Sequence, residues 1–192
     1  MTLFEFLMMI ASVVVAFGMT EIVSGWGRMM RTRAMVEPYW LHLGWTIVIL
    51  VLLIEHWVGM WTYRELLFDN IAQVVSLVIP SIFGVLAAYA ISPDIPVNGT
   101  LDVRAYYMAK RVPVFGSLAT FWAATSLPDF LIAGPDNVEF NVGIIVGAIL
   151  LIGLALTKRP WIHFSVLAIV TIAVVLFMAI SIEEIQSRFL VS

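Results

Sequence analysis

The chain has 192 residues, of which 62% are hydrophobic and only 12% are charged, with a formal net charge of −3 and a mean hydropathy of +1.03. A soluble domain carries about 25% charged residues, so this composition excludes an ordinary water-soluble protein and favours one whose surface meets a lipid bilayer. No basic stripe indicates nucleic-acid binding. The absence of cysteine excludes disulfides, thiolate metal sites and cysteine nucleophiles.

Six apolar segments have about the length of membrane-spanning helices, which need about 20 residues each. The first segment carries Glu5, lacks a basic region before it and has no A-x-A cleavage site, so we interpret it as a retained helix rather than a signal peptide. The expected spans are residues 3–24, 39–61, 71–92, 112–133, 142–157 and 161–182. The sequence therefore predicts an all-α, polytopic membrane protein, with residues 1–192 forming a single bundle of six transmembrane helices and no soluble domain.

The basic residues predict the orientation of this bundle. Eight of the ten Lys and Arg residues fall in the first, third and fifth loops, whereas only Arg64 and Arg188 lie on the other side. Because positive charge stays in the cytoplasm, we expect both termini to lie outside. We expect the plasma membrane as the location, which means the inner membrane if the protein is bacterial. The eight residues are Arg28, Arg31, Arg33, Arg104, Lys110, Arg111, Lys158 and Arg159.

Prolines and small residues suggest how the helices begin and pack. Pro38, Pro113 and Pro160 each follow basic residues, and we expect them in the first turns of the returning helices, where proline is favoured. The fifth segment contains "GIIVG", whose Gly143 and Gly147 would let two helices approach closely. The motif fits packing inside the bundle or a seam between two copies of the chain.

Glu55 and His56 follow a long apolar run, in "LIEHW". Counted from residue 39 at about 1.5 Å per residue, they lie past the midplane, about 24 Å along the second helix. The outer interface is marked nearby by Trp57 and Trp61. An ionisable group costs several kcal/mol in the membrane, so the pair either lines a polar path or forms a structural contact.

Three further acids accompany this pair. Asp129, which follows Pro128, and Glu183 are expected at a depth similar to that of Glu55, near the outer ends of their helices. Carboxylates sharing one pocket cannot all be ionised cheaply, so at least one would hold a proton or a cation. Glu21 lies near the cytoplasmic end of the first helix, where it belongs to the same candidate path or pairs with Arg28 as ordinary charge satisfaction.

Histidine spacing raises a redox alternative. His42 and His163 both lie about one turn from the cytoplasmic ends of their helices, so they would face each other as the two axial ligands of a haem b. His56 would then have no partner imidazole. No metal site other than this one is predicted.

Three functions remain open from the sequence. No HExxH, P-loop, GxGxxG or GxSxG motif indicates an enzyme. The first hypothesis is a small channel or an ion- or proton-coupled carrier, with a polar path toward the outer side. The second is a non-catalytic accessory or assembly subunit of a larger membrane complex, and the third is a haem-binding redox subunit. A homo-oligomer is compatible with the first two.

Overall fold

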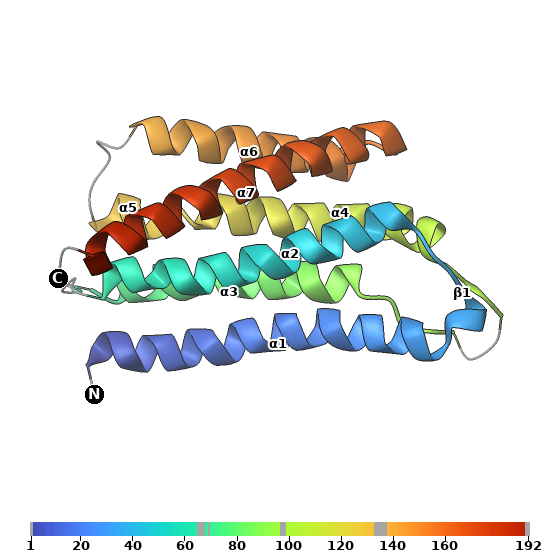
Figure 1. The fold of residues 1–192 in the computed structure, drawn as a ribbon, viewed down its shortest axis with the longest axis horizontal. Helices are drawn as coiled ribbons and strands as arrows, with labels where there is room; N and C mark the ends of the chain where they lie inside the picture. Colours follow the sequence, from blue (N-terminus) through green and yellow to red (C-terminus); the bar gives the residue numbers. More distant parts are fainter. Residues whose placement is uncertain (1, 65–67, 69, 97–98, 133–137, 191–192) are drawn as a thin grey trace. The chain divides into compact units, whose positions relative to one another are not determined.

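Helices make up most of the protein, as the sequence predicts. The computed structural model describes residues 2–64, 68, 70–96, 99–132 and 138–190; of residues 132, 138–142 and 177–190 only the backbone is described. It divides into two units, Met1–Lys158 and Arg159–Ser192. The helices are α1 (Leu3–Arg31), α2 (Trp40–Gly59), α3 (Ile71–Ile91), α4 (Val103–Ala124), α5 (Leu127–Ile132), α6 (Val138–Leu156) and α7 (Pro160–Leu190) (Figure 1).

The first helix begins where its amino-terminal amides find side-chain acceptors. Thr2 Oγ1 accepts a hydrogen bond from the Glu5 amide at 3.1 Å, and Glu5 Oε2 accepts one from the Thr2 amide at 2.8 Å. This reciprocal capping box satisfies donors that a helix start otherwise leaves open. With no proline before Pro38, α1 continues to Arg31, beyond the expected span that ends at residue 24.

Proline at position 113 is not at a helix start, so that expectation is wrong. The helix α4 begins at Val103, where the Asp102 carboxylate accepts a hydrogen bond from the Ala105 amide at 2.9 Å, and Pro113 lies inside it. An acidic N-cap determines the start more strongly than the proline does. Pro160 is the first residue of α7, as expected, and Pro38 lies just before α2.

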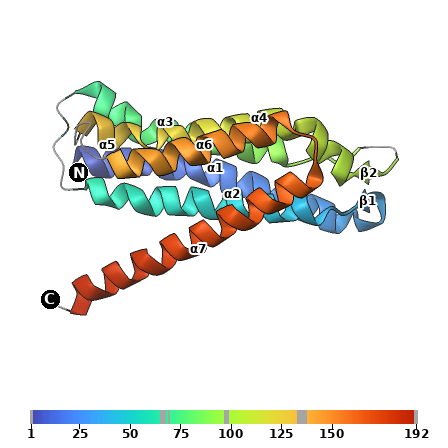
Figure 2. The same cartoon turned by 90° about the horizontal axis from the view of Figure 1, so that it is seen from above.

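Helix α3 is the centre of the first unit. It packs against α1, α2 and α4, and α6 packs against α4 (Figures 1 and 2). Its buried face contains Leu77 and Ile91 but otherwise consists of small and polar residues and Pro80, and the small ones allow the surrounding helices to approach closely. These buried residues are Gln73, Ser76, Pro80, Ser81, Gly84, Ala87 and Ala88.

Two short strands join the loops at one end of the bundle. β1 (Val36–Glu37) precedes α2 and β2 (Leu101–Asp102) precedes α4, and they pair in parallel with Val36 opposite Leu101. Figure 2 shows both strands at this end. We call it the sheet end; the opposite end, where α1 begins and α2 ends, is the distal end. The turns η1 (Arg33–Met35) and η2 (Met60–Tyr63) lie at the sheet and distal ends respectively.

Three helices are long and apolar enough to cross a membrane: Leu3–Arg31, Trp40–Tyr63 and Ile71–Ile91. The described parts of the last two long helices contain shorter apolar stretches, Gly143–Leu156 and Pro160–Leu176. Large apolar side chains are exposed along α1, among them Phe6, Val13 and Phe17. A surface of this kind suits lipid better than water. The number of spans stays a prediction.

Candidate functional site

His56 lies in the distal half of the bundle and bonds to α3. Its Nε2 is 3.0 Å from Ser81 Oγ, and its ring meets the Phe121 ring edge-on with centroids 5.6 Å apart. Ser81 is fully buried and directly follows Pro80, which interrupts the hydrogen-bond ladder of α3. A histidine inside the bundle therefore has a neutral hydroxyl as its partner, not a carboxylate.

Glu55 points away from this contact. Successive helical residues are about 100° apart, so Glu55 lies on one flank of α2, nearly opposite Trp57, whose indole donates to Ser12 of α1 at 2.8 Å. The Glu55 side chain is partly buried. Its Oε1 is buried and has no hydrogen-bond partner among the described residues. Glu55 and His56 form no ion pair with each other, and His56 bonds to Ser81 instead.

Asp129 is engaged at the distal end, in α5. Its Oδ1 accepts a hydrogen bond from the Tyr63 hydroxyl at 2.6 Å. Beside it, the Gln73 amide of α3 donates to the Leu131 carbonyl at 3.1 Å. The first bond joins α5 to η2, and the second joins it to α3. Glu183, the third predicted acid of this group, lies outside the residues whose side chains are described.

An apolar layer closes the bundle on the sheet side of His56. A Cβ atom on Gly84 would lie 2.7 Å from Leu53 Cδ2 and 3.1 Å from Phe121 Cδ2, and one on Gly18 would lie 3.0 Å from Leu53 Cδ1. Helices α1, α2, α3 and α4 therefore meet tightly around Leu53. Leu53 and Phe121 are almost completely buried, so apolar side chains fill the space between these helices at this level.

Beyond the apolar layer, Glu21 pairs with Arg28. The Arg28 guanidinium donates to Glu21 Oε1 at 2.6 Å, with both side chains only about a quarter exposed (27% and 20%). A longer contact of 3.5 Å joins Arg28 to the Pro93 carbonyl, and Ser92 Oγ donates to the Glu21 carbonyl at 3.4 Å. This pairing is the ordinary charge satisfaction that the sequence allowed for Glu21.

The carboxyl end of α3 is capped by side chains from neighbouring helices. The His42 Nε2 of α2 bonds to the Ile91 carbonyl at 2.8 Å. The Tyr106 hydroxyl of α4 lies 2.9 Å from the Ala90 carbonyl and 3.1 Å from the Ser92 carbonyl. These carbonyls have no partner within their own helix, so the side chains supply hydrogen bonds that water would otherwise have to supply.

The capping of α3 bears on the predicted haem ligands. His42 uses its Nε2 on the Ile91 carbonyl, and it packs between Tyr106 and Tyr107 with ring centroids 6.5 Å away in each case. An imidazole binds a metal through Nε2 or Nδ1, so one of the two candidate nitrogens is already engaged. His163 belongs to α7, in the second unit, so the pairing of the two imidazoles stays a prediction.

The two glycines of the "GIIVG" motif lie in different environments. A Cβ atom on Gly147 would overlap the Trp122 indole of α4, whereas one on Gly143 would meet nothing within 4 Å. Gly147 therefore permits the close packing of α6 on α4. Within the described residues, no three His, Asp or Glu side chains converge as metal ligands.

Sequence reasoning missed Ser81, Tyr63 and Tyr106. Ser81 gave a signal, because a serine next to an intrahelical proline often compensates the interrupted ladder. Tyr106 belongs to a Tyr-Tyr pair, and tyrosine is typical of anchors at the membrane interface, so nothing local indicated a helix cap. Nothing local to Tyr63 indicated Asp129 as its partner.

The chain was compared with protein-family models, with curated proteins and with solved structures. No family model, curated protein or solved structure matches it.

Proposed function

We propose that the chain is a plasma-membrane protein that crosses the bilayer six times with both termini outside. The three long apolar helices support a membrane location. Arg31 ends α1 and Arg33 follows it at the sheet end, and Arg104, Lys110 and Arg111 lie in the first turns of α4 at the same end. The sheet end is then cytoplasmic by the positive-inside rule. Reporter fusions after residues 33 and 159 should be active in the cytoplasm, and a fusion after residue 192 should not.

We further propose that this protein is a proton- or cation-coupled carrier whose loading site lies at the distal end, around Glu55. The observation that carries this proposal is the buried Glu55 Oε1, which has no partner in the described part of the chain. A carboxylate in such a place is costly when ionised, so it favours a proton or a bound cation. His56, Ser81 and Asp129 lie in the same half of the bundle as further polar groups.

The apolar layer favours a carrier over an open channel. Leu53, Gly84 and Phe121 close the bundle between the distal polar groups and the Glu21–Arg28 pair. A permanent pore needs polar or hydrated walls along its length. In a carrier, one side at a time is open, and this layer separates the two sides.

Proton or sodium flux can be measured without identifying the substrate. Purified protein in vesicles is energised with a potassium diffusion potential, and a trapped dye reports the internal pH or sodium. Glu55→Gln keeps the shape of the side chain but holds no exchangeable carboxyl proton, so flux should fall to the level of empty vesicles. The matched control is Glu37→Gln, an exposed acid in β1, which should retain flux. Wild-type vesicles without proton or sodium flux would contradict the carrier.

A second candidate is an accessory or assembly subunit. It is favoured by the way in which Glu21, Asp129, His42 and His56 all bond within the bundle. Glu55 then remains as a carboxylate to which a basic group of another subunit can bind in a larger complex or a homo-oligomer. In mild detergent, a complex should persist for the wild type and dissociate for Glu55→Gln.

Cross-linking tests the same candidate directly. The chain has no cysteine, so Val58→Cys introduces a single reactive thiol on an exposed position one turn from Glu55. Its control is Phe17→Cys, which is also at an exposed position, on α1. A cross-link that forms from position 58 and not from position 17 supports a subunit at the Glu55 flank. Haem b is not part of either proposal.

A further inference from the structure

A cleft of about 450 Å³ lies at the distal end, between the first turns of α1 and the turn η2. It is lined by Thr2, Phe4, Glu5, Met8, Trp61 and Arg64. All of these residues belong to the first unit. The volume is in the range of small-ligand sites.

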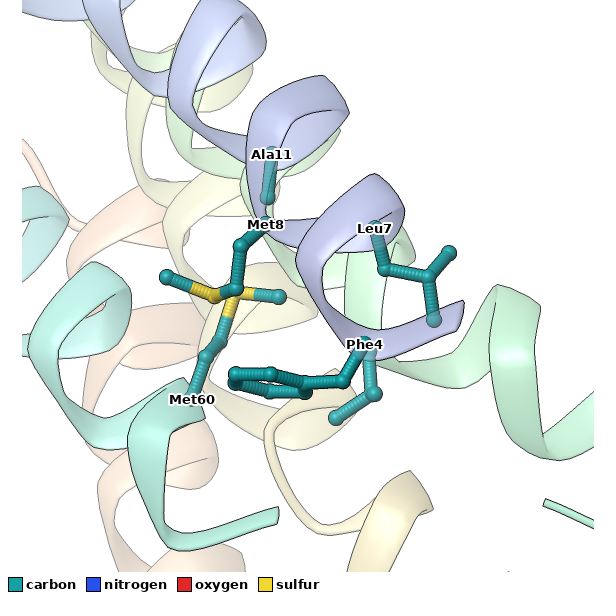
Figure 3. Packing of buried hydrophobic residues seen from close by; sticks show 6 residues of the cluster. Phe4, Leu7, Met8, Ala11 and Met60 are labelled. Atoms are coloured by element: carbon teal, nitrogen blue, oxygen red, sulfur yellow. The ribbon is translucent and has the colours of Figure 1, made fainter. Parts of the chain in front are cut away.

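The floor of the cleft is apolar and firmly supported. Phe4 and Met8 are buried and belong to a cluster with Leu7, Ala11 and Met60, whose side chains Figure 3 shows. The Phe4 ring meets Trp61 edge-on, with centroids 5.9 Å apart. Because these side chains already pack on one another, the floor is formed before any ligand arrives.

The rim of the cleft carries one side chain of each charge, Glu5 and Arg64. The amino-terminal amides of α1 are not its binding groups, since Thr2 and Glu5 already cap that helix. Arg64 is one of only two basic residues outside the loops that hold the other eight. Trp61, about half exposed, is of the kind that anchors at the headgroup level of a bilayer.

We propose that this cleft binds the headgroup of a zwitterionic phospholipid with a primary ammonium, that is, a phosphatidylethanolamine. The lipid phosphate faces the Arg64 guanidinium, and the ammonium donates to the Glu5 carboxylate. The upper acyl chain lies on Phe4, Met8 and Trp61. An anionic lipid would set its extra charge against Glu5, and a choline headgroup has no N–H to donate.

This inference rests on the proposed membrane location but not on the carrier. Glu55 lies on the α2 helix itself and does not line the cleft. If an alkaline wash releases the protein from membranes, the location and the lipid site both fail. A failed flux experiment alone leaves the lipid site standing.

The experiment uses Trp61 as the reporter. The full chain and its Trp61→Phe variant are placed in phosphatidylcholine vesicles that contain a small fraction of lipid with brominated chains, which quench nearby indoles. The difference between the two proteins isolates the Trp61 signal. Brominated phosphatidylethanolamine should quench Trp61 at a fraction about twofold to fivefold lower than brominated phosphatidylglycerol or phosphatidylcholine, the preference expected for an exposed charge pair.

Substitutions of the rim residues Glu5 and Arg64 test which side chain binds the ammonium and which binds the phosphate. Glu5→Gln still caps α1, because glutamine also serves in a capping box, yet it should remove the preference for the ammonium lipid. Arg64→Gln should weaken quenching by every phosphate-bearing brominated lipid. Arg33→Gln, at the sheet end, is the matched control and should behave as the wild type. Equal quenching by the three lipids, stronger quenching by phosphatidylglycerol, or a preference that survives both rim variants overturns the proposal.

Discussion

The His56 imidazole and the Ser81 hydroxyl lie 3.0 Å apart, at the point where Pro80 interrupts α3. The bond joins α2 to the turn of α3 that contains Pro80. It also removes His56 as a counter-ion for Glu55, which is its neighbour in sequence. The two adjacent polar residues of "LIEHW" therefore have different environments, one satisfied inside the bundle and one without a partner in the part of the chain described.

Ser81→Ala should destabilise the protein. The variant leaves the His56 nitrogen inside the bundle without a hydroxyl, and a buried unsatisfied polar group costs about 1–3 kcal/mol. The measurement is the midpoint of unfolding in detergent, followed by circular dichroism. Thr120→Ala is the control, because the exposed Thr120 hydroxyl bonds only to Gly116 of its own helix. Equal midpoints for the two variants would show that the His56–Ser81 bond does not contribute to stability.

The two glycines of the "GIIVG" motif should respond differently to alanine. Gly147→Ala forces a methyl group against the Trp122 indole, and overpacking of this kind costs about 1–3 kcal/mol. Gly143→Ala meets open space and should be neutral or slightly stabilising in a helix. Thermal unfolding of both variants makes the comparison. If Gly143→Ala instead lowers the molecular mass seen in light scattering, the motif forms a seam between copies.

The Glu21–Arg28 pair should show coupling in a double-mutant cycle. Glu21→Gln leaves the Arg28 guanidinium, already with an unpartnered Nε, without its carboxylate. Since both side chains keep some exposure, we expect a coupling energy of about 1 kcal/mol between Glu21→Gln and Arg28→Gln. Unfolding in detergent measures all four proteins of the cycle. Simple additivity of the two substitutions would contradict a stabilising pair.

Tyr106 should make the protein sensitive to alkaline pH. It lies in α4 before the expected membrane span, and burial, followed by the charge of Asp94, raises its pKa to about 12 from 10.0. Folding thus favours the neutral phenol, which donates to the end of α3. Its contribution to stability is complete below pH 10 and is lost as the pH rises through about 12. Between these values the wild type should lose more stability than Tyr106→Phe, as measured by unfolding midpoints at each pH.

Glu55→Leu should not destabilise the fold. The described structure gives the Glu55 Oε1 no hydrogen bond to lose, and removing a buried, unpaired carboxylate removes a desolvation cost. We expect an unchanged or higher unfolding midpoint, together with the loss of flux expected for Glu55→Gln. A loss of stability above about 1 kcal/mol, the size of a typical hydrogen bond, would reveal a structural partner for Glu55.

The sequence predicts the helical content and the positions of most helices, because apolar runs bounded by charged or turn residues are local signals. The start of α4 at Val103 was not predicted. Pro113 suggests a later start, whereas the Asp102 carboxylate caps the helix at its true beginning. The two-residue strands β1 and β2 were also missed. Pairing between such short segments depends on the helices that bring them together, not on their own residues.

The sequence predicts where Glu55 and His56 lie along their helix, but not what they contact. Depth along α2 follows from counting residues, so Glu55 and His56 were placed correctly near one end of their helix. Which neighbour each side chain meets depends on the rotation of α2 and on the packing of α3 beside it. The rotation of a helix cannot be deduced from a single sequence. Ser81 as the partner of His56 and Tyr63 as the partner of Asp129 are therefore known only from the structure.

The parallel pairing of Val36 with Leu101 determines an order of events during synthesis. All of α2 and α3 lies between the two strands, so β1 leaves the ribosome long before its partner exists. The loop after α1 stays open until α3 has been made and returned to the same side. Sheet closure therefore waits until about half of the chain has been made, and it sets α2 and α4 to begin at a common level.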